Sequence, residues 1–317
     1  MYQLKIDDFG GFDRYTFGNE ATGNSFSIVP SFGATLVSLR FSGREVLDGY
    51  QTGADLVANK WSKSAILCPF PNRLEDGQYN IGGKAYQFPL NNAATGNAIH
   101  GFMKDKPMDV IYTDSTEKRS IIACSYRYEG SYAPYPFPFY LTVIAEMTGV
   151  SGDFRLYMLM ANMEKGADAF PAGLGWHPYF RLSDRVDELW LQMPPICEKI
   201  AVNDRMLPTG ERTPFDDFVA ERLIGDAVLD NCFVVPNTEG RAIVTLRNKH
   251  GKLRYWQETG VEKSNFVQVF TPPHRESIAI EPMTCNVNAF RNGDGLVMLD
   301  NEKRLVCECG LSWVENP

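Results

Sequence analysis

Tyr140 to Met147 reads Tyr-Leu-Thr-Val-Ile-Ala-Glu-Met, with apolar Leu141, Val143 and Ala145 at every second position. Because successive side chains of a strand point to opposite faces, this period predicts a β-strand with one buried face. Similar runs are Ser120 to Tyr128, Phe154 to Met163, Ala242 to Leu246, Leu253 to Gln257, Phe266 to Phe270, Ser277 to Ile280 and Arg304 to Trp313. Clusters of Gly, Pro, Asn and Asp between the runs predict turns, and therefore meandering antiparallel strands.

The rest of the chain fits the same architecture. Phe26 to Phe41 reads as strand, turn and strand, and Val202 to Asp230 as a long irregular excursion. Asp184 to Met193 has some helical character, but we find no convincing helix longer than about three turns. There is no fixed-period repeat and no linker rich in Pro and Ser. The sequence predicts an all-β protein with one continuous antiparallel domain over residues 1–317.

Composition and charge limit the partners. The chain has 317 residues, of which 44% are hydrophobic and 22% charged, as in a folded globular protein. A formal charge of −8, without a run of Lys and Arg, argues against a nucleic-acid or anionic-membrane surface. No apolar run has the length of a signal peptide or a membrane span, so we expect a cytoplasmic location. Seven scattered cysteines predict reduced thiols rather than disulfides or a zinc site.

One stretch suggests chemistry: Gly173 to Leu182 reads Gly-Leu-Gly-Trp-His-Pro-Tyr-Phe-Arg-Leu. Its two glycines allow close approach of the backbone, and Pro178 fixes the dihedral after His177, so the imidazole can be aimed. The neighbouring aromatic residues offer apolar faces with polar edges, which suit a sugar. The alternative is a core histidine in an aromatic cluster.

Other candidates are His100, which also stands beside glycine and an aromatic residue, and Glu281, where an apolar run breaks at Pro282. Burial at such a strand end would raise the proton affinity of the carboxylate, although a glutamate there can also turn to solvent. Arg73 lies near another strand end, where a solvated arginine is the ordinary case. The chain has no nucleophile elbow, phosphate loop, dinucleotide fingerprint or zinc helix, and its histidines lack metal-site spacing.

Six short motifs in order resemble the aldose 1-epimerase (mutarotase) family over nearly the whole chain. They are Asn72-Arg73, His100-Gly101, His177-Pro178-Tyr179-Phe180, Leu229-Asp230, Val267-Gln268 and Glu281-Pro282. The resemblance implies a large antiparallel β-sandwich, the galactose mutarotase-like supersandwich. It also implies a carbohydrate cleft across one sheet and no cofactor.

The resemblance further implies the role of each residue. Glu281 would take the proton of the anomeric hydroxyl, His177 would protonate the ring oxygen, and His100 would assist there. The residues that would hold the sugar hydroxyls are Asn72, Arg73, Tyr179, Asp230 and Gln268. We expect Glu281 to raise the pKa of His177 and keep it protonated near neutrality, giving a bell-shaped pH–rate curve between about pH 5 and 8.

Other functions stay open at this stage. A hexose-6-phosphate mutarotase would need a cationic pocket, and no arginine cluster accompanies Arg73. A non-catalytic sugar-binding module on the same fold would not need an acid–base pair, and a cupin-like metal enzyme would need converging ligands. Which aldose is preferred and which oligomeric state the protein adopts are not predicted.

Overall fold

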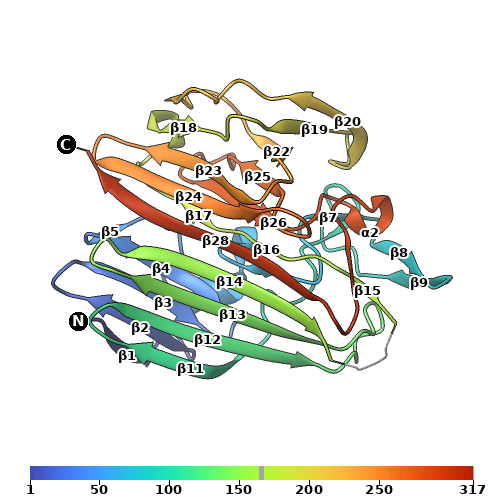
Figure 1. The fold of residues 1–317 in the computed structure, drawn as a ribbon, viewed down its shortest axis with the longest axis horizontal. Coiled ribbons are helices and arrows are strands. Elements are labelled where there is room, and N and C mark those ends of the chain that lie inside the picture. The colour runs from blue at the N-terminus through green and yellow to red at the C-terminus, as the bar shows by residue number, and fades with distance from the viewer. Residues whose placement is uncertain (164–167, 317) are drawn as a thin grey trace.

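Two large antiparallel sheets form the body of the protein (Figure 1). The computed structural model describes residues 1–163 and 168–316. From one edge to the other, the nine-stranded sheet contains β11 (Asp109–Ser115), β12 (Arg119–Tyr128), β13 (Phe139–Thr148), β14 (Asp153–Asn162), β28 (Arg304–Glu315), β24 (Gly251–Thr259), β23 (Gly240–Arg247), β18 (Trp190–Gln192) and β21 (Arg222–Leu223). The predicted meander is confirmed, since β12, β13 and β14 pair in chain order.

The eight-stranded sheet carries the candidate site. Its strands are β20 (Pro208–Pro214), β19 (Glu198–Val202), β22 (Asp230–Val234), β25 (Phe266–Phe270), β26 (Ile278–Met283), β16 (Gly175–Trp176) and β6 (Ile66–Leu67), with β17 (Tyr179–Phe180) also paired to β26. Strands that lie far apart in the sequence, such as β6, β16 and β26, are therefore neighbours here.

Smaller elements surround the two sheets. A five-stranded sheet contains β1 (Gln3–Asp8), β2 (Asp13–Asn19), β3 (Asn24–Val29), β4 (Thr35–Phe41) and β5 (Arg44–Glu45). Three strand pairs are β7 (Arg73–Glu75) with β10 (Asn97–Ile99), β8 (Gln78–Ile81) with β9 (Lys84–Gln87), and β15 (Phe170–Ala172) with β27 (Val297–Leu299). The helices are α1 (Gly53–Ala58), α2 (Ala289–Asn292) and the 3-10 turns Lys60–Ser62 and Val186–Glu188. No helix of the described residues has the length and apolarity to cross a membrane.

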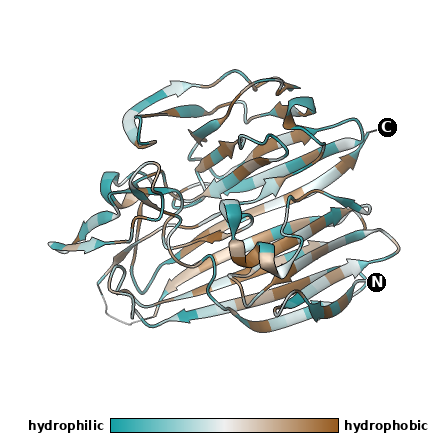
Figure 2. Cartoon of the chain, turned by 180° about the vertical axis from the view of Figure 1, so that it is seen from behind, coloured by the Kyte–Doolittle hydropathy of each residue, from teal (hydrophilic) through white to brown (hydrophobic). Residues whose placement is uncertain are grey.

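The core lies between the two large sheets. Val269 and Ile280 of the eight-stranded sheet belong to one buried cluster with Leu141, Cys307 and Leu311 of the nine-stranded sheet. Hydrophobic and hydrophilic residues alternate along the strands, as the coloured bands in Figure 2 show. Each fully buried aliphatic side chain contributes about 1.5–3 kcal/mol, so this alternation stabilises the stacked sheets. All seven cysteines are buried free thiols, as predicted.

Two sequence-based predictions are wrong in detail. The excursion from Val202 to Asp230 contains strands β20 and β21, and the segment expected to be helical forms only a 3-10 turn followed by β18. Both misses have one cause. Each of these strands is defined by its pairing, β20 with β19, β21 with β18, and β18 also with β23, and local alternation does not report such pairing.

Candidate active site

Strands β25 and β26 carry two predicted site residues side by side. Glu281 of β26 pairs in register with Gln268 of β25. Their strand neighbours Ile280 and Val269 enter the core, so alternation turns Glu281 and Gln268 to the opposite face of the sheet. The prediction that Glu281 lies at a strand end is wrong, because β26 continues to Met283. The carboxylate therefore lies inside the sheet and is only 2% exposed.

His177 lies in the short break between β16 and β17. Its N–H donates to the carbonyl of Ala65 at 3.0 Å, and its carbonyl accepts from the N–H of Ser64 at 2.8 Å. Gly175 permits a close approach of β16 to β26, since a Cβ there would lie 2.8 Å from the carbonyl oxygen of Pro282. The expectation of close backbone approach at this glycine is confirmed. These contacts hold the imidazole beside β26.

The imidazole and the carboxylate face each other. His177 Nε2 lies 3.4 Å from Glu281 Oε1, and both side chains are buried. Burial favours the uncharged form of each group. It lowers the pKa of His177 to about 3 and raises the pKa of Glu281 well above its usual value, where Asp230 adds to the increase. The prediction that Glu281 keeps His177 protonated is therefore wrong, because burial lowers the pKa of His177 instead of leaving it raised.

His100 is fixed by Asn72 through two hydrogen bonds. The N–H of His100 donates to the carbonyl of Asn72 at 2.9 Å, and the N–H of Asn72 donates to Nδ1 of His100 at 3.2 Å. Since Nδ1 accepts, the neutral ring carries its proton on Nε2. Burial, with the nearby His177, lowers the pKa of His100 well below its usual value. His100 is therefore a neutral hydrogen-bond donor, and its ring meets that of His177 edge to face with centroids 5.0 Å apart.

A chain of side-chain hydrogen bonds runs through the site. Arg73 Nη1 donates to Asn72 Oδ1 at 3.2 Å, and Asn72 Nδ2 donates to Gln268 Oε1 at 3.2 Å. Gln268 Nε2 then donates to Asp230 Oδ1 at 2.9 Å. Among the described residues, buried Arg73 Nε and Glu281 Oε2 have no hydrogen-bond partner. A ligand with several hydroxyl groups can satisfy such a donor and such an acceptor.

The remaining ionisable groups add donors and acceptors. Burial raises the pKa of Asp230, and the charge of Arg73 partly opposes that increase. Burial also raises the pKa of Tyr179, with Glu281 adding to the effect, so the phenol keeps its proton and can donate. Within residues 1–163 and 168–316, no group of three or more His, Cys, Asp and Glu side chains is placed to hold a metal ion.

All the predicted site residues line one cavity of about 370 Å³. They are Asn72, Arg73, His100, His177, Tyr179, Asp230, Gln268 and Glu281. The cavity lies on the face of the eight-stranded sheet that is turned away from the core. The structure thus brings together residues from six separate motifs of the sequence.

Sequence reasoning missed six further lining residues. They are Trp61, Ser62, Asn91, Asn92, Ile99 and Phe270. Phe270 follows Gln268 by two positions, so the period of a strand was a signal that could have found it. No local pattern marks Trp61, which adopts φ 66°, a left-handed conformation that is rare for a bulky residue.

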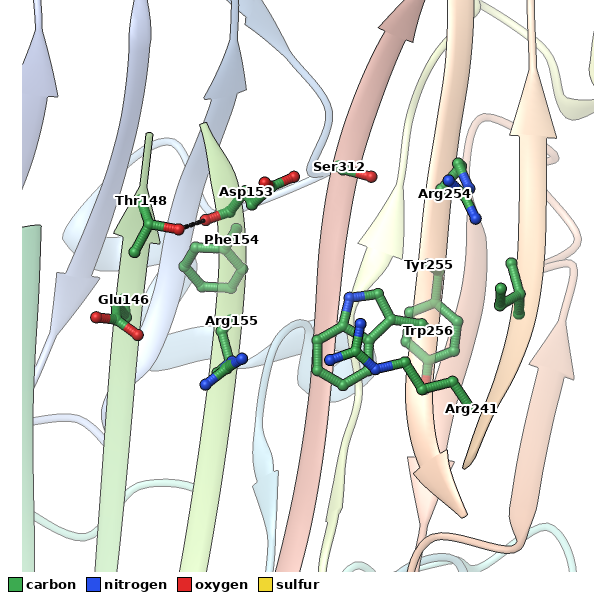
Figure 3. Close-up of a pocket in the computed structure, with 11 residues that line it drawn as sticks. Glu146, Thr148, Asp153, Phe154, Arg155, Arg241, Arg254, Tyr255, Trp256 and Ser312 are labelled. Carbon is green, nitrogen blue, oxygen red and sulfur yellow. Dashed lines mark hydrogen bonds between the residues drawn. The ribbon is translucent and has the colours of Figure 1, made fainter. Parts of the chain in front are cut away.

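A larger hollow of about 510 Å³ lies on the outer face of the nine-stranded sheet (Figure 3). There the guanidinium of Arg241 lies 3.7 Å from the centroid of the Trp256 ring, and Arg155 and Arg254 flank it. None of the described residues that line this hollow is a histidine, and none belongs to the predicted site. The facing acid–base pair is what singles out the smaller cavity.

Comparison with known proteins identifies the family of the chain. A model of the aldose 1-epimerase family matches residues 13–312, almost the whole chain. The chain belongs to the aldose 1-epimerase family. It is therefore an isomerase of the mutarotase type, and the family implies a sugar substrate.

Individual relatives are distant in sequence. The protein YihR of Escherichia coli K12, whose name describes it as uncharacterized, is 26% identical over 291 residues, covering 89% of this chain and 88% of its own. A galactose mutarotase-like protein from Clostridium acetobutylicum is 18% identical, with a TM-score of 0.86 over 99% of both chains. The galactose 1-epimerase of Lactobacillus acidophilus is 16% identical, with a TM-score of 0.82 over 100% of both chains. These two structures confirm the predicted galactose mutarotase-like sandwich.

Proposed function

We propose that this enzyme interconverts the α and β anomers of a free aldohexose, with Glu281 and His177 as its acid–base pair. The observation that carries the proposal is the 3.4 Å separation of His177 Nε2 and Glu281 Oε1 at a buried wall of the cavity. Anomerisation requires proton removal and proton donation at two neighbouring oxygens of one sugar. A facing imidazole and carboxylate suit this requirement.

Ring opening moves two protons and breaks one bond. Glu281 takes the proton from the anomeric hydroxyl, the C1=O bond forms, and the C1–O5 bond breaks as His177 protonates O5. Burial favours neutral imidazole and protonated carboxyl in the resting site, so one proton first passes from Glu281 to His177 across the 3.4 Å between them. Ring opening then starts from this charged pair and returns it to the neutral form. After rotation about C1–C2, the reverse transfers close the ring to the other anomer.

The other lining residues hold the sugar. The Nε2–H of His100 donates to the ring oxygen or to a neighbouring hydroxyl, which is a role for a neutral donor rather than for an acid. Arg73 and Tyr179 donate to hydroxyls, and Asp230 accepts. Gln268, already bonded to Asp230, fixes the direction of that carboxylate.

Polarimetry of freshly dissolved α-D-glucose and α-D-galactose tests the proposal. The wild-type protein should accelerate the decay of optical rotation, and Glu281→Gln and His177→Asn should each abolish the acceleration. Arg241→Lys on the opposite face is the matched control and should keep wild-type rates. No acceleration by folded wild-type protein, with sugar binding detected by calorimetry, would instead favour a non-catalytic binding module.

A phosphorylated hexose is the second candidate substrate. Arg73 is the only Lys or Arg among the described residues that line the cavity, and Asp230 lies on the same hydrogen-bonded chain. A phosphate that carries almost two charges is usually bound by several cationic groups. Glucose 6-phosphate should therefore be a poorer substrate than glucose in the same assay.

A further inference from the structure

Arg205 holds the loop between β9 and β10, which includes Asn91 and Asn92 and forms one wall of the cavity. It projects from the turn between β19 and β20, where Asn203 Oδ1 accepts from its N–H at 2.9 Å. Its Nε donates to the carbonyl of Thr95 at 3.0 Å, and its Nη2 donates to the carbonyl of Gly96 at 3.0 Å and to Asn97 Oδ1 at 2.9 Å. A single guanidinium thus contacts three consecutive residues where this loop enters β10.

Two further contacts connect Arg205 to its surroundings. Asn97 Nδ2 donates to the carbonyl of Arg205 at 3.0 Å, and Arg205 Nη2 pairs with Asp76 Oδ1 at 2.6 Å. Asp76 follows β7, which begins at Arg73 of the candidate site. The loop, the β19–β20 turn and the start of the site are therefore tied together at one side chain.

Two asparagines of this loop, Asn91 and Asn92, line the cavity, and among the described residues only the side chain of Asn91 forms hydrogen bonds. Asn91 Oδ1 accepts from the N–H of Ile99 at 2.7 Å, and its Nδ2 donates to the carbonyl of Ile99 at 3.0 Å. Asn92 uses its backbone instead, since its N–H donates to the carbonyl of Asn97 and its carbonyl accepts from Gly96. Within the described part of the chain, no hydrogen bond is formed by the carboxamide of Asn92.

We infer that Asn92 contacts a hydroxyl of the sugar remote from the anomeric carbon, and that Arg205 is the positioning residue that holds it there. The acid–base pair is buried, whereas Asn92 is half-buried on a loop at the rim. A sugar whose anomeric carbon meets Glu281 therefore presents its far side to this loop. A carboxamide offers both a donor and an acceptor, so it can distinguish hydroxyl configurations there. This inference rests on the proposed anomerase function.

Polarimetric kinetics of Asn92→Ala, Arg205→Lys and the double variant test the inference, with D-glucose and D-galactose as substrates. Asn92→Ala should raise KM about 3- to 10-fold for at least one sugar and change the ratio of the two KM values, with kcat nearly constant, because one hydrogen bond to the bound sugar is lost. Arg205→Lys keeps the charge but loses the planar fork, so it should raise KM in the same direction. The double variant should be no worse than Asn92→Ala alone, since Arg205 acts through Asn92.

Each outcome separates this inference from the proposed function. An inactive wild-type protein contradicts the proposed function itself. An active wild type with unchanged KM values and KM ratio in Asn92→Ala overturns the role of Asn92. An Arg205→Lys effect that persists in full in the Asn92→Ala background overturns the positioning role and leaves only a structural one. Arg241→Lys is again the matched control, and thermal unfolding confirms that each variant is folded.

Discussion

Asn72 and His100 are bonded to each other twice, once between backbones and once from the Asn72 N–H to His100 Nδ1. Both residues adopt left-handed backbone conformations, with φ 57° and φ 67°. Two strained residues therefore support each other, and together they fix the tautomer of a histidine at the candidate site. Strain of this kind persists only where surrounding contacts enforce it.

A substitution at Gly101, the residue after His100, should disturb this arrangement. It has φ 65°, and a Cβ there would lie 2.1 Å from the carbonyl oxygen of Cys68. Gly225→Ala is a matched control, because its φ is 56° and nothing lies within 4 Å of the added Cβ. We expect the control to lose about 1 kcal/mol of unfolding free energy, and Gly101→Ala to lose roughly 1–3 kcal/mol more together with activity. Urea unfolding measures both, and equal losses would contradict the clash.

The left-handed backbone conformation of Trp61, at the cavity wall, should lower the stability of the protein. Its ring centroid lies 6.0 Å from that of Phe270 and 5.9 Å from that of His274, while its φ is 66°. Trp61→Ala and Trp61→Gly remove the same ring, but only glycine relieves the left-handed strain. We expect the glycine variant to be about 1 kcal/mol more stable than the alanine variant in thermal unfolding. Both should bind sugar more weakly by calorimetry, and equal stability of the two would mean that no strain is relieved.

Substitution of Gln268 should lower both stability and sugar affinity, because its carboxamide oxygen accepts from Asn72 and its nitrogen donates to Asp230. Gln268→Leu leaves Asn72 Nδ2 and Asp230 Oδ1 without this partner, which we expect to cost about 1–3 kcal/mol of unfolding free energy and to raise KM. Gln192, whose amide donates to the carbonyl of Val219 at 3.1 Å in the other sheet, provides the control substitution. If Gln192→Leu raised KM as much, the effect would not be specific to the site.

The pH dependence of kcat/KM should reflect a pair that shares one proton. Below the His177 pKa of about 3 both groups are protonated and no base remains, whereas above the raised pKa of Glu281 the pair has no proton to donate. Activity should therefore fall at strongly acid pH and again as the pH rises through the raised pKa of Glu281, with apparent pKa values that belong to the pair. Rates corrected for the uncatalysed reaction test this. A loss of kcat/KM as the pH falls through 6.5, the usual histidine pKa, would contradict the effect of burial on His177.

Much of the fold was predictable because alternation is a local property. The runs that predict β12, β13 and β14 need only one buried face, and the residues themselves supply it. Strands β20 and β21 are almost wholly exposed, so no hydrophobic alternation distinguishes them from a loop. Their existence depends on pairing, β20 with the preceding β19 and β21 with the more distant β18.

Alternating strands that pack as antiparallel sheets follow from the order of the residues, and the motifs already name side chains that meet in the cavity. The charge state of these side chains depends on how the folded chain buries them. The fold buries both His177 and Glu281, and loss of hydration is the main reason that the pKa of the imidazole falls and that of the carboxyl rises. The tertiary structure also decided that Asn92 and Trp61 line the cavity, because a position on a wall depends on how distant segments such as the Arg205 turn hold a loop.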